Sequence, residues 1–327
     1  MYETRVLSGM RPTGSLHLGH YHGVLKNWIR LQAEYTCLFF VADWHALTTD
    51  YARHESIADN TVEMVLDWLA VGLDVDRSVI FQQSAVPEHA ELALLLGMLT
   101  PVPWLERTPT YKEQREQLTD RDLSTYGFLG YPVLQAADVL MYKAEVVPVG
   151  IDQAPHIELT REIARRFNGL YGPVFPEPAT LLTDTPKMVG TDGRKMSKSY
   201  GNAVYLTEAP ADVHGKLARM VTDPRRVRRH DPGDPNDCPA YQSFHRHYCT
   251  PEELRHQEEG CRTAAIGCLE CKEIMIKHVQ AELAPIRARR ATLRPDDARA
   301  VLAAGNARAR AVASGTIAEV RAAMGLA

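Results

Sequence analysis

Short runs of apolar residues alternate with longer segments of helical periodicity over the first two hundred positions of the chain. Four of these runs, at residues 5–10, 36–43, 78–83 and 146–150, end at a turn or a polar boundary and predict buried strands. Between them, apolar residues recur at helical spacing in segments 18–31, 57–69 and 88–99. Strands separated by helices predict βαβ units and a parallel sheet with helices on both faces, an α/β fold.

The pattern changes after about residue 207. Strand-like runs disappear, proline and charge increase between 223 and 239, and the remaining periodicity predicts helices, for example at 274–283, 297–309 and 311–324. We place a domain boundary near residue 203, so that residues 1–202 form the α/β domain and residues 203–327 form a smaller, all-helical domain. The last helix is expected to pack back on the first domain.

The composition is that of an ordinary globular protein. Hydrophobic residues make up 45% and charged residues 24% of the 327 positions. No stretch approaches ~18 uninterrupted apolar residues, so we expect no membrane span. Residues 1–10 lack the basic start and the apolar run of a signal peptide. The chain is therefore expected to be cytoplasmic.

The net charge of −4 argues against a protein that coats nucleic acid without selectivity. A local basic face is still sufficient to contact phosphates, and arginines gather in two places. These are Arg225, Arg226, Arg228 and Arg229, and then Arg287, Arg289, Arg290 and Arg294. Each cluster fits a phosphate-binding face and a solvated charged surface equally well.

The first motif with chemical content, residues 11–20, follows the first predicted strand and opens a helix. In a parallel sheet this junction lies where ligands bind, and a helix amino terminus offers unpaired N–H groups to phosphate. Gly14 permits a tight turn and Gly19 a close approach of a nucleotide to the backbone. His17 and His20 would lie on one side of the first turn and could donate to phosphate oxygens. Such a string alone also arises by chance.

A second motif, residues 195–199, places Lys195 and Lys198 three positions apart after a glycine-flanked stretch. Two ammonium groups on a mobile loop suit a clamp that stabilises the charge of a leaving pyrophosphate. For two lysines alone, an exposed basic loop is the simpler interpretation. We call residues 11–20 the signature turn and residues 195–199 the lysine loop.

In this order and separation, the two motifs resemble the paired signatures of class I aminoacyl-tRNA synthetases. Residues 43–46, 131–138 and 150–153 also resemble segments of the tryptophan and tyrosine subclass, so the likeness extends from about residue 6 to the last helix. It implies a Rossmann-like catalytic domain, an anticodon-binding helical domain and a homodimer. The implied reaction uses ATP with Mg²⁺, forms an aminoacyl-adenylate and pyrophosphate, and then esterifies the terminal ribose of tRNA.

The resemblance also implies a set of site residues. No side chain need act as a nucleophile, because catalysis rests on positioning and on stabilisation of phosphoryl charge. The implied catalytic residues are His17, His20, Lys195 and Lys198. The implied ATP-binding residues are Arg11, Pro12, Thr13, Gly19, His20, Gly150, Ile151, Asp152, Lys195, Met196, Ser197, Lys198 and Ser199.

Asp138 is the candidate for recognition of the amino-acid side chain. A buried carboxylate that accepts a hydrogen bond from an indole N–H would reject phenylalanine, by about 10⁴–10⁵ in comparable sites. A tyrosine hydroxyl could donate to the same group, and a structural aspartate that caps a helix is a further alternative. We expect Gln153 to contact the α-amino group and His45 to shape the pocket.

Four of the six cysteines favour tryptophan. Cys238, Cys261, Cys268 and Cys271 are separated by 22, 6 and 2 residues. Four thiolates suit structural zinc or a [4Fe–4S] cluster. The spacing resembles that of a bacterial subgroup of tryptophan enzymes with a [4Fe–4S] cluster near the anticodon-binding region, which favours iron–sulfur and tRNA(Trp) as the partner. Cys37 is expected in the core. Cys249 does not fit the spacing but could replace Cys238.

Two positions depart from the pattern of the tryptophan enzymes. The signature turn has a histidine at His20 where many carry asparagine, and Gln135 stands where methionine is usual. Three alternatives to the tryptophan enzyme remain: the tyrosine enzyme on the same scaffold, a paralogue that charges no tRNA, and a small adenylyl-transferring enzyme. The cysteine spacing, the intact motifs and the long helical domain, respectively, oppose them. Segment 90–99 is either a dimer interface or a core helix.

Overall fold

The computed structural model describes residues 4–52, 54–108, 123–182 and 188–326. Its centre is a parallel sheet of five strands in the order β3-β2-β1-β4-β5. The strands are β1 (Arg5–Met10), β2 (Thr36–Val41), β3 (Ser78–Gln82), β4 (Val146–Val149) and β5 (Ala179–Leu182). The four predicted strands are confirmed, and so is the α/β fold class. Strand β5 was not predicted, because it is a short edge strand whose residues are exposed or only half-buried and give no apolar run.

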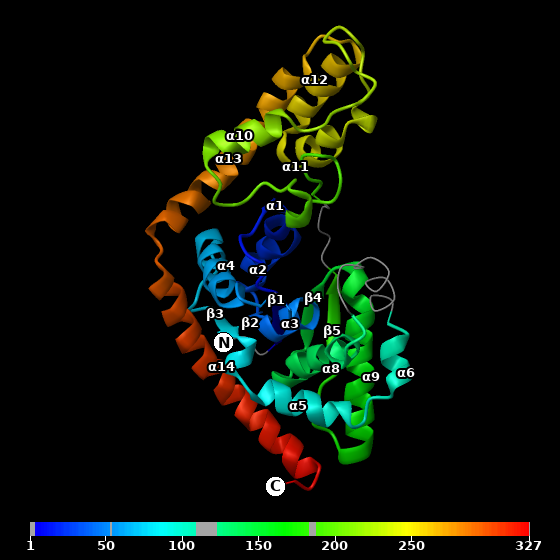
Figure 1. The fold of residues 1–327 in the computed structure, drawn as a ribbon, viewed down its shortest axis with the longest axis vertical. Coiled ribbons are helices and arrows are strands. Elements are labelled where there is room, and N and C mark those ends of the chain that lie inside the picture. The colour runs from blue at the N-terminus through cyan, green and yellow to red at the C-terminus, as the bar shows by residue number, and fades with distance from the viewer. Residues whose placement is uncertain (1–3, 53, 109–122, 183–187, 327) are drawn as a thin grey trace.

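Helices cover both faces of the sheet (Figure 1). One layer holds α2 (Lys26–Leu31) and α4 (Ile57–Val71), and the other holds α5 (Glu88–Gly97), α8 (Tyr126–Met141) and α9 (Ala154–Tyr171). Successive strand residues point to opposite faces of the sheet. Phe39 therefore packs in the core on the side of α2 and α4, and Phe40 packs in the core on the side of α5, α8 and α9. Trp28 of α2 stacks on Phe39 with ring centroids 4.4 Å apart. This alternation explains why the strands are apolar almost throughout.

The segment predicted as one helix over 18–31 is interrupted. It comprises α1 (Leu18–His20), a π-helical turn over Tyr21–Leu25, and α2. The apolar spacing alone did not distinguish these forms, because a π-helical turn widens the helix by one residue and leaves the overall pattern nearly intact. Gly23 and Val24 of the wide turn line the main cavity described below.

Two shorter helices, α3 (Asp43–Asp50) and α6 (Val102–Glu106), complete the first part of the chain. The helical part contains α10 (Pro210–Ala218), α11 (Arg246–Tyr248), α12 (Pro251–Arg262), α13 (Cys268–Thr292) and α14 (Pro295–Ala323). Figure 1 shows α13 descending from the helical part beside α4 and α14 continuing along the sheet past β3 towards α5. The expectation of two helices at 297–309 and 311–324 is wrong, since α14 is continuous.

Helix α14 covers the edge strand β3 at very short range. A Cβ added to Gly305 would lie 1.7 Å from the carbonyl oxygen of Ile80, so only glycine fits there. The next residue, Asn306, accepts a hydrogen bond from the backbone N–H of Gln82 (2.8 Å). The helix thereby satisfies part of an otherwise open sheet edge.

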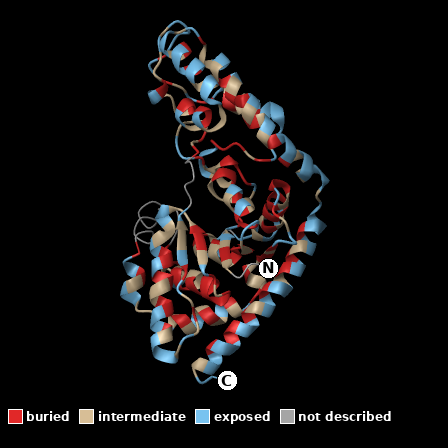
Figure 2. Cartoon of the chain, turned by 180° about the vertical axis from the view of Figure 1, so that it is seen from behind, coloured by how far each residue is buried: buried red, intermediate tan, exposed pale blue. Residues whose placement is uncertain are grey.

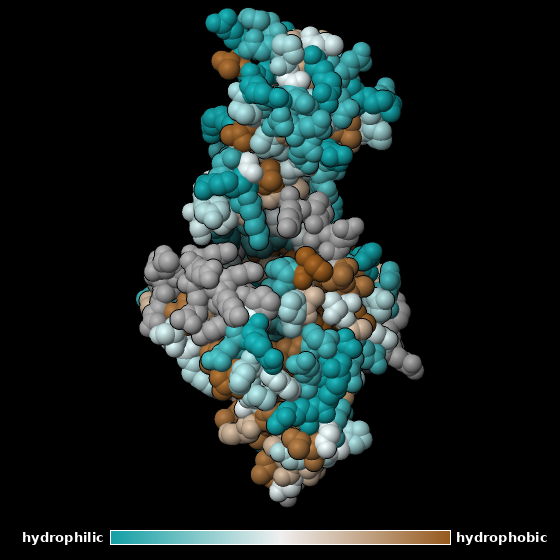
Figure 3. Space-filling view, turned by 90° about the vertical axis from the view of Figure 1, so that its right-hand side faces the viewer, coloured by the Kyte–Doolittle hydropathy of each residue, from teal (hydrophilic) through white to brown (hydrophobic). Residues whose placement is uncertain are grey.

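Buried residues concentrate around the sheet and on the inner side of α14 (Figure 2). Hydrophilic side chains dominate the helical part at the top of Figure 3. Among the helices of the described residues, none combines the length and the apolarity that a membrane crossing requires.

Candidate active site

The main cavity, of about 390 Å³, lies at the carboxyl ends of β1, β2 and β4. Met10 and Arg11 follow β1 on its wall, Ala42 follows β2, and Gly150 follows β4. The volume is in the range of small-molecule sites. Gly9 keeps its place on this wall because an added Cβ would lie 2.4 Å from the Phe40 ring. The cavity is where a parallel sheet is expected to bind ligands.

The carboxylate of Asp138 lies on this cavity and is held by three donors. Oδ1 accepts from Gln83 Nε2 (2.7 Å) and from His89 Nδ1 (2.6 Å), and Oδ2 accepts from His45 Nε2 (2.8 Å). Burial alone would raise the pKa of Asp138, but the hydrogen bonds and charges of His45 and His89 hold it below its usual value. A fully ionised acceptor therefore faces the cavity in a fixed orientation.

Three residues of this site were not predicted from the sequence: Gln83 and His89, which bind Asp138, and Tyr142, which contacts His89. His89 Nε2 lies 2.7 Å from the Tyr142 hydroxyl, and both side chains are fully buried. Burial, followed by the charge of Asp138, raises the pKa of Tyr142, so the hydroxyl stays neutral. Because Asp138 can only accept, the Nδ1 atom of His89 carries a proton. This chain of contacts ties the turn after β3, α5 and the end of α8 to one carboxylate.

Other predicted residues lie on the rim or beside it. His45 and Gln153 line the cavity together with Asp138, and Gln153 Nε2 donates to Asp152 (3.2 Å). A Cβ on Gly150 would lie 2.7 Å from Asp152 Oδ1, which explains the glycine. Ile151 is 70% exposed. The rest of the signature turn and the lysine loop are adjacent to the cavity but outside its lining.

The two histidines of the signature turn hold one another and the start of α1. His17 Nδ1 accepts from the Gly19 N–H (3.1 Å) and His20 Nδ1 accepts from the His17 N–H (3.3 Å), with ring centroids 3.8 Å apart. Burial lowers the pKa of His17 to about 4 and that of His20 to about 3. Both rings are neutral at pH 7. Since each Nδ1 accepts, each proton resides on Nε2, which remains a donor.

The lysine loop contacts the signature turn directly. Lys198 Nζ donates to the carbonyl of Thr13 (2.7 Å). Burial lowers the pKa of Lys198 to about 8, against the opposing charge of Asp67. The role of Asp67 at this site was not predicted from the sequence. Asp67 is buried in α4 and accepts a hydrogen bond from the Leu16 N–H (3.0 Å). Burial raises the pKa of Asp67 to about 6. One carboxylate thus acts on both motifs.

A second missed residue, Asn202, supports the lysine loop from within. It is buried, accepts from the Ser197 N–H (2.8 Å), and donates to Asp192 Oδ1 (2.7 Å) and to the Lys195 carbonyl (3.2 Å). A Cβ on Gly190 would lie 2.2 Å from its amide, so the glycine makes room for it. Met196 anchors the loop in the core, which leaves Lys195 exposed.

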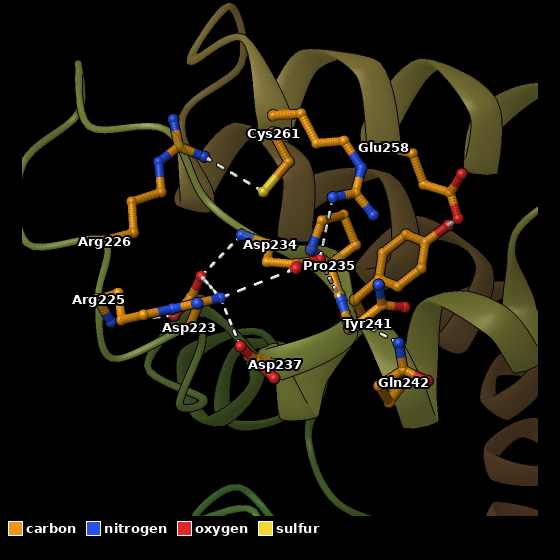
Figure 4. A network of polar contacts seen from close by, with 12 residues as sticks. Asp223, Arg225, Arg226, Asp234, Pro235, Asp237, Tyr241, Gln242, Glu258 and Cys261 are labelled. Atoms are coloured by element: carbon orange, nitrogen blue, oxygen red, sulfur yellow. Dashed lines mark hydrogen bonds and ion pairs between the residues drawn. The ribbon is translucent and has the colours of Figure 1, made fainter.

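Cys238, Cys261, Cys268 and Cys271 line one small cavity in the helical part, which we call the cysteine pocket. Two buried cations, Arg226 and Lys272, line it too. Arg226 Nη1 lies 3.9 Å from Cys261 Sγ (Figure 4). Burial, followed by the other thiols, raises the pKa of Cys271 to about 12. Cys249 is not among the lining residues, and Cys37 is fully buried in β2 as expected.

Several arginines of the two clusters make contacts within the chain. Arg225 pairs with Asp223 and Asp237 (Figure 4), and Arg226 donates to the carbonyls of Arg229 and Ile266. In the second cluster, Arg289 donates to the Ala70 carbonyl (2.5 Å) and Arg290 pairs with Glu63 (2.6 Å). Arg226 is buried, so it is not part of an open basic face. Arg225 and Arg289 are exposed despite these contacts, and for them a phosphate-binding face stays a prediction.

Comparison with known proteins gives the family. The sequence matches the family described as tRNA synthetases class I (W and Y) over residues 2–284. A tryptophan–tRNA ligase of Thermotoga maritima is 54% identical over 98% of this chain and 99% of the relative, and one of Aquifex aeolicus is 46% identical over 98% and 100%. This chain belongs to the class I tryptophan–tRNA ligases.

A solved structure of a relative has the same fold as this chain. The tryptophanyl-tRNA synthetase of Campylobacter jejuni, complexed with ADP and tryptophan, superposes with a TM-score of 0.88 at 29% identity, covering 99% of this chain and 100% of that one. As a member of this ligase family, the chain is an aminoacyl-tRNA synthetase. The alternatives of a tyrosine enzyme and of a small adenylyl-transferring enzyme are not supported by these comparisons.

Proposed function

We propose that the chain activates L-tryptophan with ATP to tryptophanyl-adenylate, releases pyrophosphate, and transfers tryptophan to the 3′-terminal ribose of tRNA(Trp). One observation carries this proposal: an ionised, buried Asp138 on a cavity that adjoins the docked signature turn and lysine loop. Tryptophan-dependent ATP–pyrophosphate exchange on the purified chain tests it.

Asp138 selects the side chain in this proposal. A carboxylate has about four acceptor positions, and three are used by Gln83, His89 and His45. The fourth accepts the indole N–H, while Phe40 and Val147 offer apolar contacts to the ring. Phenylalanine leaves that acceptor unpaired in a dry site, which costs binding energy. Gln153 binds the α-amino group from the rim, and Gln135 lies on the wall where relatives of this kind usually place methionine.

Phosphoryl transfer follows from the two motifs. The tryptophan carboxylate attacks the α-phosphate of ATP, and the bond to the leaving pyrophosphate breaks. The Nε2 donors of His17 and His20 and the ammonium groups of Lys195 and Lys198 act on the phosphate charge as it grows. Mg²⁺ accompanies the ATP. Gly150, Ile151 and Asp152 bind the ribose, and Arg11, Pro12, Thr13, Gly19 and Met196 to Ser199 complete the nucleotide site.

The chain divides in this proposal into a catalytic domain, residues 1–202, and an anticodon-binding helical domain, residues 203–327, with the last helix packed on the catalytic domain. The contact of Gly305 with Ile80 supports that packing. The absence of a spanning helix among the described residues is consistent with the cytoplasm, where tRNA charging takes place.

We propose that Cys238, Cys261, Cys268 and Cys271 hold a [4Fe–4S] cluster. The residues of the cysteine pocket fit an anionic group. Four thiolates carry −4, and either Zn²⁺ or a [4Fe–4S]²⁺ core leaves −2. Arg226 and Lys272 offset that charge, while the buried Asp223 on the same pocket is paired with Arg225. The Arg226 Nε atom is buried and has no hydrogen-bond partner among the described residues. Its N–H group can therefore donate to an anionic group in the pocket.

The preference for iron–sulfur over zinc rests on the resemblance of the cysteine spacing along the chain. Among the described residues, the four sulfurs do not all lie within 4.8 Å of one another. A tetrahedral zinc site with bonds of about 2.3 Å would place them about 3.8 Å apart, so the thiol side chains would have to turn to bind zinc. Anaerobic analysis tests the assignment: we expect iron and sulfide, and stoichiometric zinc without iron would contradict it.

We also propose that the chain forms a homodimer. Four large apolar side chains near α5 are exposed. They are Leu94 in α5 (59%), Met98 directly after it (73%), Val102 in α6 (52%) and Tyr126 in α8 (80%). Tyr126 reaches to within 3.8 Å of a Cβ built on Gly97, so α5 and α8 contribute to one apolar patch. The opposite side of α5 packs Leu92 and Leu96 into the core. Segment 90–99 thus serves the core and, in this proposal, a second copy as well.

A further inference from the structure

The helical part contains a second group of metal-ligating side chains. Cys249 ends α11, Glu253 lies in the first turn of α12, and His278 lies on α13. In the part of the chain that the structure describes, the thiol sulfur, a carboxylate oxygen and an imidazole nitrogen of these residues all lie within 4.8 Å of one another. None of these three residues lines the cysteine pocket, although Gln257 and His245, which lie beside Cys249, do.

The glutamate and the histidine are already oriented towards each other. Glu253 Oε2 accepts from the Thr250 N–H (2.8 Å), which caps α12 and fixes the carboxylate. His278 Nε2 lies 2.9 Å from Oε2 and 3.0 Å from Oε1 of Glu253. Each side chain is 31% exposed. A cation can therefore enter from solvent and keep one water ligand.

Burial raises the pKa of the Cys249 thiol, and one buried hydrogen-bond donor, Gln257, opposes that rise. Gln257 Nε2 lies 3.5 Å from Cys249 Sγ, and Gln257 is fully buried. Its Oε1 atom lies 3.0 Å from His245 Nδ1, which fixes the amide with its nitrogen towards the sulfur. A donor aimed at sulfur stabilises the thiolate, and the thiolate is the form that binds metal.

The simpler interpretation is a helix cap combined with an ion pair. The same fold offers that arrangement elsewhere, since His214 Nε2 lies 2.8 Å from Glu273 Oε1 with no cysteine in the group. What distinguishes Cys249, Glu253 and His278 is the convergence of a sulfur, a nitrogen and an oxygen ligand, together with the buried amide behind the sulfur. This mixed set suits a borderline cation and does not suit Mg²⁺ or Ca²⁺, which prefer oxygen.

We propose that Cys249, Glu253 and His278 form a zinc site that ties the α11–α12 junction to α13. The site lies near the cysteine pocket, because the charge of Cys249 acts on Cys271. A metal there would hold α12 and α13 against each other beside the cluster thiols. The proposal does not depend on which metal the cysteine pocket holds.

The test measures metal content and thermal stability of the full chain. Wild type, His278→Ala, Glu253→Gln and the control His214→Ala are purified anaerobically and equilibrated with chelator-buffered zinc. Zinc, iron and protein are then determined. Glu253→Gln keeps an oxygen for the Thr250 N–H, so it preserves the cap of α12 while removing the charge. A melting curve with and without zinc accompanies each sample, and far-UV circular dichroism checks folding.

We expect wild type and His214→Ala to hold about one zinc more per chain than His278→Ala and Glu253→Gln, with iron equal in all four. Added zinc should raise the Tm of wild type and His214→Ala only. If the cysteine pocket holds zinc instead of a cluster, the total rises but the difference of one remains. Equal zinc in wild type and both site variants would overturn the proposal, as would a parallel loss of iron.

Discussion

Asp138→Asn tests whether the buried carboxylate recognises the indole. Gln83 and His89 both donate to Oδ1, whereas His45 alone donates to Oδ2. The amide oxygen of asparagine should therefore take the place of Oδ1, because its NH₂ group would otherwise oppose two donors. The NH₂ group then faces His45 and the cavity, so it meets the indole N–H donor to donor.

The magnitude follows from the hydrogen bonds. A bond to a charged acceptor contributes about 1.5–3 kcal/mol, and a buried donor left unpaired costs about 1–3 kcal/mol. We expect a loss of about 2–4 kcal/mol in transition-state binding of tryptophan, or about 30- to 1,000-fold in kcat/KM. The free energy of unfolding should also fall, because His45 loses its acceptor.

Steady-state ATP–pyrophosphate exchange with tryptophan and with phenylalanine measures both rate and selectivity. Tyr142→Phe is the matched control: it removes a buried hydroxyl behind His89, so it should lower stability by about 1 kcal/mol while leaving the KM for tryptophan unchanged. An Asp138→Asn variant with the wild-type KM and wild-type discrimination against phenylalanine would refute the assignment of Asp138 to the indole.

Three further predictions concern the lysine loop, the cysteine pocket and the apolar patch. Because the pKa of Lys198 is about 8 in the free protein, its ammonium is lost as pH rises through that value. We therefore expect kcat/KM for ATP to fall above about pH 8 in wild type but not in Lys198→Arg, whose guanidinium stays charged; identical profiles would contradict this. Cys268→Ala should lower tRNA charging more than pyrophosphate exchange, since the pocket lies in the helical part; equal losses would instead indicate global unfolding. Met98→Glu should convert a dimer to a monomer in sedimentation, while Val227→Glu, which is 83% exposed outside the patch, should not. A monomeric wild type, or a dimeric Met98→Glu, would argue against that interface.

The strands that carry the site were predictable because burial on both faces makes them apolar throughout. The polar residues after β1, β2 and β4 then indicated where the cavity lies. Strand β5 was not predictable, since Leu182 is 55% exposed and the strand is only four residues long. The π-helical turn after His20 also escaped detection, because its apolar residues keep a nearly helical spacing.

The supporting residues of the site were harder to find than the motifs. His89 lies 49 and Gln83 lies 55 positions from Asp138 in the chain, and no local pattern links them. Asp67 did leave a signal: it is a charged residue between Leu66 and Trp68 in a helix whose neighbouring positions are buried. A carboxylate there needs partners, which proved to be the Leu16 N–H and the Arg290 guanidinium. Asn202 follows the lysine loop without any periodicity that would mark it.

The role of the arginine clusters could not be decided from the sequence. Composition alone left a phosphate-binding face and a solvated surface open. Neither describes Arg226, which is buried and donates to a backbone carbonyl, and even the exposed Arg289 donates to one. Such contacts join segments 40 and 219 positions apart, so only the folded chain reveals them.

We propose that this cavity activates tryptophan with ATP. Amino-acid-dependent ATP–pyrophosphate exchange on the purified chain, with tryptophan and tyrosine compared at equal concentrations, is the decisive measurement. We expect rapid exchange with tryptophan and no response to tyrosine. Exchange that tyrosine supports equally well, or no exchange with either amino acid, would contradict it.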